Sequence, residues 1–287
     1  MNDTPTIRSK VAALIVAHNP DYATFALVLG SVAKQVDRVI IVDNGSDNRG
    51  SLEDLCKKLS NCEFIELGFN SGVAHALKVG ARHAAIKHHP EWLLLLDDDT
   101  VVLNDALNKS LNIINNLTVN VRGKVGAVLL SSFVGDCTVK ETRYGIFSGT
   151  LIKTQVALDT CCRDDFFLDQ ADFDMYSRIR ELHYLALSIN CKLVNHRIGQ
   201  KRWIPILHKV TDYEPPWRYY YMVRNSTRLL IENRMRFSYY ASQMMQWGSI
   251  IILVNGIRAF IKAFGLGLAH ALLGEFGYLD RKFFDAK

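Results

Sequence analysis

Three consecutive aspartates, Asp97, Asp98 and Asp99, directly follow the apolar run Trp92–Leu96. Five apolar residues in a row are typical of a strand buried on both faces of a parallel sheet. Adjacent carboxylates repel one another, and a divalent cation held by oxygen ligands would offset their charge. Because open α/β sheets bind ligands beyond the carboxyl ends of their strands, this run predicts a cation site. The alternative is a strand-ending turn that caps the next helix.

A second group of acids, Asp169, Asp172 and Asp174, lies at the start of a predicted helix. A metal-assisted transfer needs one set of carboxylates for the cation and a separate carboxylate that takes the acceptor's proton. Asp172 and Asp174 are two residues apart, so only one of them is expected to face a substrate. The alternative is that these acids simply stabilise the helix dipole.

Further polar residues follow other predicted strands. Asp43 ends the second strand, where a ligand's base or ribose would lie. Asn70 and Gly72 precede a helix whose free N–H groups could face a diphosphate. His196 becomes a candidate ligand for Mn²⁺ only if a metal is expected on other grounds. The structural alternatives are a turn, a helix cap and a surface histidine.

Strand-like and helix-like segments alternate through the first half of the chain, which predicts a doubly wound parallel sheet with right-handed crossovers. The first strand–helix junction, Ala17–Pro20, has no G-x-G-x-x-G, and the chain has no P-loop motif. Dinucleotide-binding oxidoreductases and P-loop phosphotransferases are therefore disfavoured. The predicted strands are Val11–Ala17, Arg38–Val42, Cys62–Ile65, Trp92–Leu96 and Lys124–Leu130, and the predicted helices are Asp21–Val36, Leu52–Leu59, Val73–Lys87 and Asn104–Leu117.

The pattern is less regular after residue 130. We expect strands at Phe147–Ile152 and Cys191–Asn195, a helix at Asp172–Leu182, a loop from Gly199 to Trp217 that could cover a site, and a helix at Trp217–Arg236.

Composition points to a folded protein with a modest net charge of +5. Nucleic acid is not an expected partner, because no basic-aromatic module accompanies the basic residues. The six cysteines show neither a C-x-x-C pair nor zinc-ligand spacing, so they are expected to be reduced. With no signal-peptide pattern at the start, the sequence predicts a cytoplasmic protein.

The C-terminal segment tests that expectation. Phe237–Ile257 is uncharged but interrupted by polar residues, so a membrane-spanning helix is not expected. Ile257–Phe276 mixes basic and apolar residues, which suits a helix in the membrane interface, with burial against the main domain or a second subunit as the alternative. We therefore expect two domains, residues 1–230 and residues 231–287, the latter a helical membrane-interface or dimerisation segment.

Taken together, these segments resemble the inverting family 2 glycosyltransferases of the GT-A fold, and most of all bacterial rhamnosyltransferases that use a dTDP-activated sugar. The resemblance covers about residues 11–230 and implies a mostly parallel nucleotide-sugar-binding sheet with helices on both faces. It rests on Ala17–Pro20, Val42–Ser46, Asn70–Ala76, Leu96–Thr100, Ser148–Leu151, Phe167–Asp169, Asp172–Asp174 with Arg178, His196–Gly199 and Tyr220–Asn225.

The resemblance also implies roles for individual residues. Asp97 and Asp99 match the outer positions of the family's D-x-D motif, which holds Mg²⁺ or Mn²⁺, and His196 could complete the metal shell. Asp172 matches the catalytic base, which would deprotonate the acceptor hydroxyl. Asp43 would accept the pyrimidine N3–H. The implied substrate-binding residues are Ala17, Asn19, Asp43, Asn70, Gly72, Asp97, Asp98, Ser148, Gly149 and Arg224.

The implied function is transfer of a sugar, L-rhamnose from dTDP-rhamnose, to a lipid-linked or polysaccharide acceptor in bacterial surface-glycan (O-antigen) synthesis, at the cytoplasmic face of the membrane. Asp98 departs from the rhamnosyltransferase pattern, where Gln is more frequent. Three aspartates also occur in galactofuranosyltransferases, so a UDP-sugar galactosyl- or galactofuranosyltransferase is the first alternative. A nucleotidyltransferase and a non-catalytic binding subunit are the others, and a homodimer is also compatible with the C-terminal helices.

Overall fold

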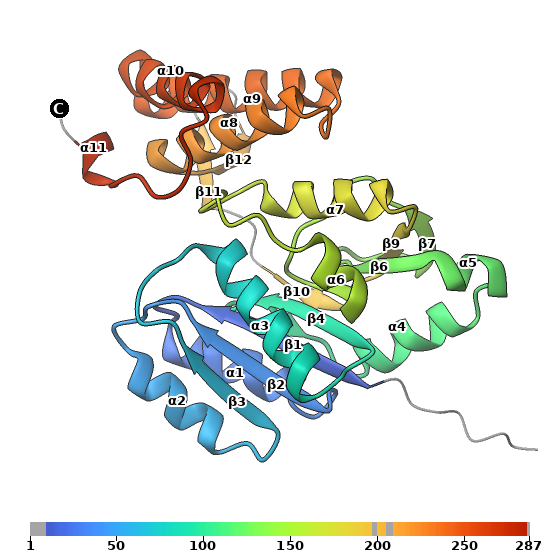
Figure 1. Cartoon of the computed structure of the whole chain (residues 1–287). Helices are drawn as coiled ribbons and strands as arrows, with labels where there is room; N and C mark the ends of the chain where they lie inside the picture. Colours follow the sequence, from blue (N-terminus) through green and yellow to red (C-terminus); the bar gives the residue numbers. More distant parts are fainter. Residues whose placement is uncertain (1–9, 197–199, 205–208, 286–287) are drawn as a thin grey trace, which may run out of the picture. The chain divides into compact units, whose positions relative to one another are not determined.

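The computed structural model describes residues 10–196, 200–204 and 209–285 (Figure 1). The chain forms two compact units. Helices α3 (Val73–Lys87) and α7 (Ala171–Glu181) each contribute residues to both of them. Unit 1 consists of Met1–Ser71, Ala76–Cys161 and Arg178–His196, and unit 2 consists of Gly72–His75, Cys162–Ser177 and Arg197–Lys287.

Unit 1 is built on a mixed sheet of eight strands in the described part of the chain. In spatial order these are β3 (Cys62–Glu66), β2 (Arg38–Asp43), β1 (Val11–Ala17), β4 (Trp92–Asp97), β8 (Thr150–Lys153), β6 (Val125–Leu130), β9 (Leu185–Asn190) and β7 (Thr138–Glu141). Strands β1 to β4 are mutually parallel, whereas β8 runs antiparallel between β4 and β6. The expected α/β architecture is confirmed, with antiparallel strands added in its second half.

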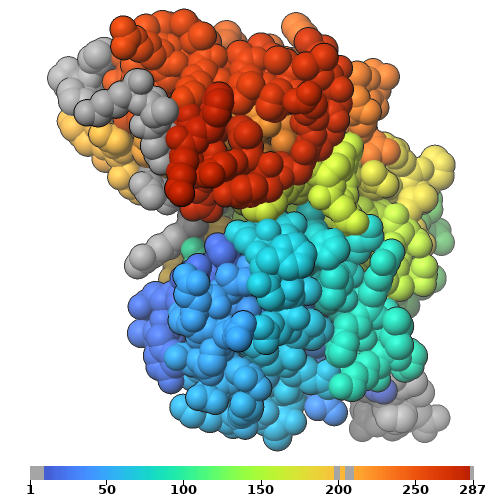
Figure 2. Space-filling view, turned by 60° about the vertical axis from the view of Figure 1, so that its left-hand side comes forward, coloured from blue at the N-terminus to red at the C-terminus, as the bar shows by residue number. Residues whose placement is uncertain are grey.

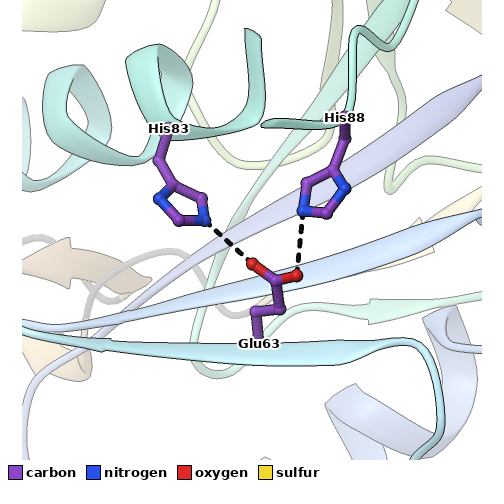
Figure 3. A group of neighbouring side chains, drawn as sticks. All are labelled: Glu63, His83 and His88. Atoms are coloured by element: carbon purple, nitrogen blue, oxygen red, sulfur yellow. Dashed lines mark hydrogen bonds and ion pairs between the residues drawn. The ribbon is translucent and has the colours of Figure 1, made fainter. Parts of the chain in front are cut away.

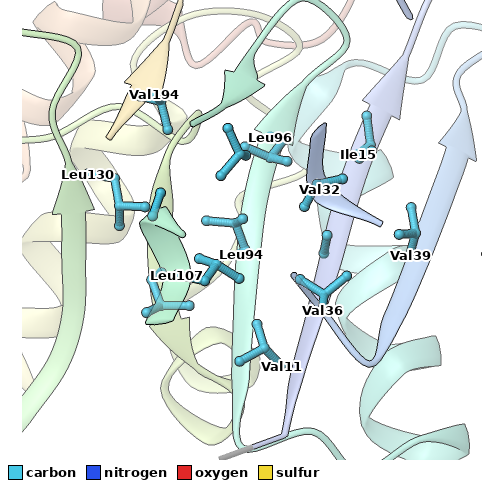
Figure 4. Close-up of a cluster of buried hydrophobic side chains, with 14 of the residues drawn as sticks. Val11, Ile15, Val32, Val36, Val39, Leu94, Leu96, Leu107, Leu130 and Val194 are labelled. Atoms are coloured by element: carbon cyan, nitrogen blue, oxygen red, sulfur yellow. The ribbon is translucent and has the colours of Figure 1, made fainter. Parts of the chain in front are cut away.

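Helices cover both faces of the sheet. Helices α1 (Tyr22–Val32) and α4 (Ala106–Asn115) share one apolar cluster with alternate residues of β1 and β4 (Figure 4). Helix α2 (Arg49–Lys57) adds buried apolar residues to the same cluster. Because both faces are covered, β1 is buried along its whole length. A strand in this position must be apolar throughout, which is why the continuous runs of the sequence identified it.

Helix α3 packs on the opposite face of the sheet, and Gly80 permits its close approach. A Cβ atom at Gly80 would lie 2.2 Å from the Leu14 side chain and 2.8 Å from that of Val42. The helix therefore settles against β1 and β2 at a point where any larger residue would push it away. This contact fixes the position of the loop that leads into α3.

Most predicted elements of the first half are confirmed within a few residues at their ends. The predicted bounds of β1 and α3 match the structure, and Asp21 accepts a hydrogen bond from Thr24 N–H at 2.9 Å, which caps α1. Sequence patterns missed strands β7, β9 and β5 (Val101–Val102) and the short helices α5 (Val119–Lys124) and α6 (Thr154–Thr160). The expected strand at Cys191–Asn195 contains β10 (Val194–Asn195), whose pairing with β5 was not predicted. These elements are short, and partners distant in sequence stabilise the missed strands.

The expected loop from Gly199 to Trp217 is wrong. Gly199 lies outside the described residues, but the segment contains a hairpin of β11 (Gln200–Ile204) and β12 (Lys209–Tyr213). The adjacent prolines, Pro215 and Pro216, mark the start of helix α8 (Pro216–Ile231), where proline at the first turn is well tolerated.

The expectation that the cysteines are reduced is also wrong. Cys56 and Cys62 form a disulfide that links α2 to β3, and Cys137 and Cys191 form another that links the start of β7 to the end of β9. Both pairs join segments that the sheet brings side by side, which spacing along the chain does not reveal. The cysteines therefore no longer support the expected cytoplasmic location.

Unit 2 contains helix α8 packed against α9 (Phe237–Asn255) and α10 (Ile257–Leu273), followed by the short helix α11 (Lys282–Asp285). Its core is rich in aromatic residues, including Tyr219, Tyr220, Tyr221 and Trp247. Among the described residues, no helix has the length and apolar character needed to cross a bilayer. The expected domain boundary near residue 230 remains a prediction.

Candidate functional site

The carboxyl ends of β1, β2 and β4 meet at one edge of unit 1, because these strands are parallel. Ala17 pairs with Asp43, and Val16 pairs with Asp97. The polar residues that follow each strand are therefore brought together, as the sequence predicted from the position of this edge.

A chain of hydrogen bonds joins the loops after the first three strands. His18 Nδ1 donates to the Asn44 carbonyl at 3.0 Å, and Asn70 Nδ2 donates to His18 Nε2 at 3.0 Å, which corresponds to a neutral imidazole protonated on Nδ1. Asn44 Nδ2 in turn donates to Asn70 Oδ1 at 3.1 Å, and Asn44 Oδ1 accepts from the backbone N–H of Ser71 at 2.8 Å. These bonds fix Asn70 at the strand edge.

The candidate nucleoside residues lie in the same loops. Asp43 is fully buried and accepts from Ser46 N–H at 3.2 Å. Asn19 has a positive φ of 55°, a conformation that asparagine tolerates, and its N–H donates to Ser46 Oγ at 2.9 Å. Ala17 is the buried last residue of β1. Ser46 thus ties the loop after β1 to the loop after β2.

The three aspartates after β4 differ in their surroundings. Asp98 Oδ2 accepts from His18 N–H at 2.9 Å, which turns this side chain toward β1. Burial, together with the neighbouring charges of Asp97 and Asp99, raises the pKa of Asp98 to about 7 despite that bond. Asp97 and Asp99 remain partly exposed. Asp98 therefore stabilises the loop, whereas the carboxylates of Asp97 and Asp99 are accessible to solvent.

His196 reaches Asp97 and Asp99 because β10 pairs with β5. Asn195 lies opposite Val101, so the next residue, His196, falls beside Thr100. His196 Nδ1 is 3.2 Å from Asp99 Oδ1, and His196 Nε2 is 3.9 Å from Asp97 Oδ2. The sequence named these three residues, and the structure brings them together. Arg197–Gly199, the rest of that motif, lie outside the described residues.

The side chains of Thr100 and Ser148 position Asp97 and His196. Thr100 Oγ1 is 2.6 Å from His196 Nδ1 and 2.7 Å from Ser148 Oγ, and Ser148 Oγ accepts from Asp97 N–H at 2.9 Å. Ser148 is buried, so it supports Asp97 and Thr100, whereas its expected contact with substrate remains a prediction. Gly149 has a φ of +84°, and its N–H donates to the Leu95 carbonyl, which holds the loop against β4.

The group has the donor set of a divalent cation site. One oxygen each of Asp97 and Asp99 and one nitrogen of His196 lie within 4.8 Å of one another. Burial lowers the pKa of His196, but the hydrogen bond with Asp99 and the charges of Asp97 and Asp99 outweigh it, so the pKa is raised. Two carboxylates with one imidazole suit Mg²⁺ or Mn²⁺.

Within unit 2, the structure separates Asp172 from Asp174. Asp174 is fully buried, and its carboxylate lies 2.5 Å from Arg234 and 3.9 Å from Arg163. Asp172 is only partly buried in the first turn of α7, and its Oδ1 accepts from Phe173 N–H at 2.9 Å. The expectation that these two side chains point in different directions is confirmed.

Two further candidates in unit 2 have clear structural roles. Gly72 has a φ of +87°, and a Cβ atom there would lie 2.4 Å from the Phe167 carbonyl oxygen, so only glycine fits. Arg224 is 1% exposed and donates to Tyr220 Oη at 3.2 Å and to the Gly277 carbonyl at 3.0 Å. Its guanidinium is enclosed by aromatic rings, which gives Arg224 a packing role, and its expected contact with substrate remains a prediction.

Sequence reasoning missed three residues that organise the site, His18, Asn44 and Thr100. Each lies inside a motif that the sequence singled out, but next to the residue chosen for chemistry. Their hydrogen bonds join loops from different strands, so spacing along one segment gives no signal for them.

Residues 13–128 match the family model described as Glycosyl transferase family 2. The chain contains a family 2 glycosyltransferase domain. The chain is similar to the dTDP-rhamnosyl transferase RfbF of Shigella flexneri, with 24% identity over 248 residues that cover 80% of this chain and 82% of that protein. The expectation of an enzyme of the glycosyltransferase class is confirmed.

The chain also resembles solved GT-A structures. A mannosyltransferase from Pyrobaculum calidifontis, determined in complex with GDP-Man and Mn²⁺, aligns with a TM-score of 0.56 at 14% identity, covering 94% of this chain and 88% of that one. TarS residues 1–349 from S. aureus align with a TM-score of 0.54 at 12% identity, covering 93% and 88%. These alignments confirm the GT-A fold.

Proposed function

We propose that this glycosyltransferase moves L-rhamnose from dTDP-rhamnose to a saccharide acceptor, with inversion at the anomeric carbon. The observation that carries the proposal is the group of Asp97, Asp99 and His196 at the carboxyl end of β4, where a nucleotide-sugar diphosphate would meet a cation. The similarity to a dTDP-rhamnosyl transferase along most of the chain supports dTDP-rhamnose as the donor. A UDP-linked galactosyl or galactofuranosyl donor is the alternative, because Asp98 stands in the middle of the acidic run.

Asp97, Asp99 and His196 would hold Mg²⁺ or Mn²⁺. When bound, such an ion neutralises the charge that develops on the departing nucleoside diphosphate. Asp98 keeps the loop in place through His18, and Thr100 fixes the imidazole of His196 through Nδ1. The protein thus supplies a preorganised ligand set on a rigid strand end.

Asp43 would recognise the pyrimidine of the donor. A carboxylate has more lone pairs than the hydrogen bonds from Ser46 use, so it can also accept an N3–H. Asn19 and Ala17 would line the same pocket, and Asn70 and Gly72 would border the ribose and diphosphate. Asn70 is positioned for this role by His18 and Asn44.

Asp172 would act as the base that takes the proton of the acceptor hydroxyl. Its partial exposure in the first turn of α7 supports this assignment, and the burial of Asp174 against two arginines argues against the neighbouring acid. The acceptor oxygen would then attack the anomeric carbon opposite the leaving diphosphate. Inversion requires such a single displacement.

Sugar transfer by Asp172→Asn tests the assignment. The amide cannot accept the proton, so kcat is expected to fall by roughly 10²–10⁴-fold while nucleotide binding persists. Asp159→Asn, which changes an exposed aspartate on α6, is the matched control and should keep full activity. Unchanged transfer by Asp172→Asn would remove this residue from the base role.

A panel of nucleotide sugars tests which sugar the enzyme transfers. The purified enzyme is incubated with Mn²⁺ and each of dTDP-rhamnose, UDP-galactose and UDP-galactofuranose, and nucleotide release is measured. We expect release from dTDP-rhamnose only, and its abolition by EDTA. Preferential turnover of a UDP-sugar would favour the alternative donor and leave the fold assignment intact.

We further propose that the acceptor is lipid-linked and that α10 rests on the cytoplasmic membrane surface. Exposed apolar residues recur along one stripe of α10, and Arg258 and Lys262 lie on the same helix. The stripe consists of Ile257, Ile261, Leu268 and Leu272, and the helix belongs to the orange-to-red segment in Figure 2.

Co-flotation of the protein with anionic vesicles tests this surface. We expect flotation that Ile261→Glu with Leu272→Glu abolishes. A protein that stays unbound but sediments as a dimer, and becomes monomeric in that variant, would assign the stripe to a homodimer instead.

A further inference from the structure

A second group of metal-binding side chains lies at the outer edge of the sheet in unit 1. Glu63 of β3 faces His83 of α3 and His88, which directly follows that helix (Figure 3). One ligand atom from each of the three residues lies within 4.8 Å of the others. We propose that Glu63, His83 and His88 bind a zinc-class divalent cation.

The geometry of the group is close to that of a tetrahedral zinc site. His83 Nε2 is 2.8 Å from Glu63 Oε2, and His88 Nε2 is 3.0 Å from Glu63 Oε1. Ligand atoms around tetrahedral Zn²⁺, at bond lengths near 2.0 Å, are about 3.3 Å apart. Each histidine nitrogen thus lies within about half an ångström of that spacing from a carboxylate oxygen, and all three ligand atoms lie within 4.8 Å of one another, so modest side-chain movements would admit the ion.

His88 supplies the second observation. Its Nε2 is buried and, although close to Glu63 Oε1, is not aligned for a hydrogen bond, so it has no hydrogen-bond partner among the described residues. A buried polar atom without a hydrogen bond is costly. Coordination to a cation would satisfy this nitrogen.

The chemistry of the donors selects the ion. Two imidazoles and one carboxylate are a frequent set for Zn²⁺, with water as the fourth ligand, whereas Mg²⁺ and Ca²⁺ prefer oxygen. Lys87 Nζ lies 3.1 Å from Glu63 Oε2 and would have to leave. Its side chain is more than half exposed, so it can swing into solvent.

The place of the group in the fold indicates a structural role. Glu63 is near the amino end of β3, whereas the nucleotide-sugar site lies at the carboxyl ends of the parallel strands. An ion here would join the end of α3 to the edge strand. Because it would bind the folded state and not the unfolded one, it would stabilise unit 1 without taking part in sugar transfer.

Zinc binding by the full-length protein tests the proposal. The metal-free protein carries Asp99→Asn with His196→Ala, so that the strand-edge site does not compete, and Zn²⁺ is titrated by calorimetry. We expect one bound Zn²⁺, a higher melting temperature with Zn²⁺, and a cobalt derivative with the visible absorption of a tetrahedral site.

Three variants in that background identify the ligands. Glu63→Gln and His88→Ala should each weaken Zn²⁺ binding by at least about 100-fold, the upper end of the loss that follows removal of an outer-shell partner alone. His89→Asn is the matched control, since it removes the neighbouring exposed imidazole and keeps a residue that tolerates the φ of 49°. Lys87→Gln should bind Zn²⁺ more tightly, because it removes the competing ammonium group.

Two results would overturn the proposal. One is the absence of stoichiometric Zn²⁺ binding in the Asp99→Asn, His196→Ala protein. The other is equal affinity in the Glu63→Gln, His88→Ala and His89→Asn proteins, with circular dichroism spectra that show all three to be folded. The group would then be an ion-pair cluster in which His83, His88 and Lys87 stabilise the carboxylate of Glu63.

Discussion

The acids after β4 and the acids at the start of α7 look alike in the sequence, but their charges are compensated in different ways. At the strand edge, burial and, to a smaller extent, the charges of Asp97 and Asp99 raise the pKa of Asp98 to about 7. In unit 2, Asp174 is fully buried beside the guanidinium groups of Arg163 and Arg234. The first cluster suits an added cation, whereas the second already contains its cations.

This difference indicates that the acids after β4 serve function, whereas Asp174 serves stability. A carboxylate cluster in which burial and like charges raise a pKa stores electrostatic repulsion that a ligand can relieve. A buried carboxylate paired with arginines, such as Asp174, is part of the folded core and serves the structure. Asp172 differs from both groups, because it keeps the partial exposure that the proposed base needs.

The largest effect is expected from Asp99→Asn at the strand edge. Loss of one proposed cation ligand should reduce sugar transfer by about 10³-fold, comparable to removal of a single charge-stabilising group in other enzymes. The melting temperature should stay the same or rise, because a repelling charge is gone. Steady-state kinetics with Mn²⁺ and a thermal melt check both parts. Full activity would show that the two clusters do not differ in function.

Asp174→Asn should show the reverse pattern. Removing the charge leaves Arg163 and Arg234 partly unpaired, which is expected to reduce the free energy of unfolding by about 3–5 kcal/mol. Urea denaturation measures this loss. The protein that remains folded should keep its catalytic turnover number, and a selective loss of turnover would place Asp174 in the chemistry after all.

Thr100→Val sharpens the comparison at the strand edge itself. The substitution removes the hydroxyl that contacts His196 Nδ1 and Ser148 Oγ but keeps the shape of the side chain. We expect the Mn²⁺ concentration for half-maximal activity to rise about 10–100-fold, with most of kcat recovered at saturating Mn²⁺. An unchanged metal requirement would mean that Thr100 does not position His196.

The smallest effect concerns pH. Burial raises the pKa values of Asp165 and Glu232, but hydrogen bonds and charges from Arg163 and Arg228 outweigh it and hold both below their ordinary values. The folded state therefore binds fewer protons than the unfolded state, and stability should fall as pH drops below about 4.5.

Urea midpoints between pH 7 and pH 3 measure this dependence. In Arg163→Gln, the pKa values of Asp165 and Glu232 lose a common cause of their depression, so the curve should be flatter. An equally steep curve in the variant would assign the acid sensitivity to other groups.

The sequence predicted the first half of the fold because its signals are local. Continuous apolar runs mark strands covered on both faces, and the polar residues after β2 and β4 mark the edge where parallel strands end. The position of that edge correctly predicted that Asp43 and Asp97 lie at the carboxyl ends of neighbouring strands. It failed for the hairpin β11–β12, where a loop was expected. It also failed for strands β7 and β9, whose short segments are stabilised by partners distant in the chain.

By itself, the sequence determined which residue types could bind a cation, a diphosphate or a proton, and roughly where the first strands and helices lie. Only the tertiary structure decided which of them act together. The β5–β10 pairing carries His196 across 96 residues to Thr100, and the arginines around Asp174 make it structural. Arg224 is enclosed by aromatic rings, and Glu63 meets its two histidines only because α3 folds back over β3. The physical reason is that strand pairing and helix packing join residues distant in sequence, and these contacts set the charge and burial that give a side chain its role.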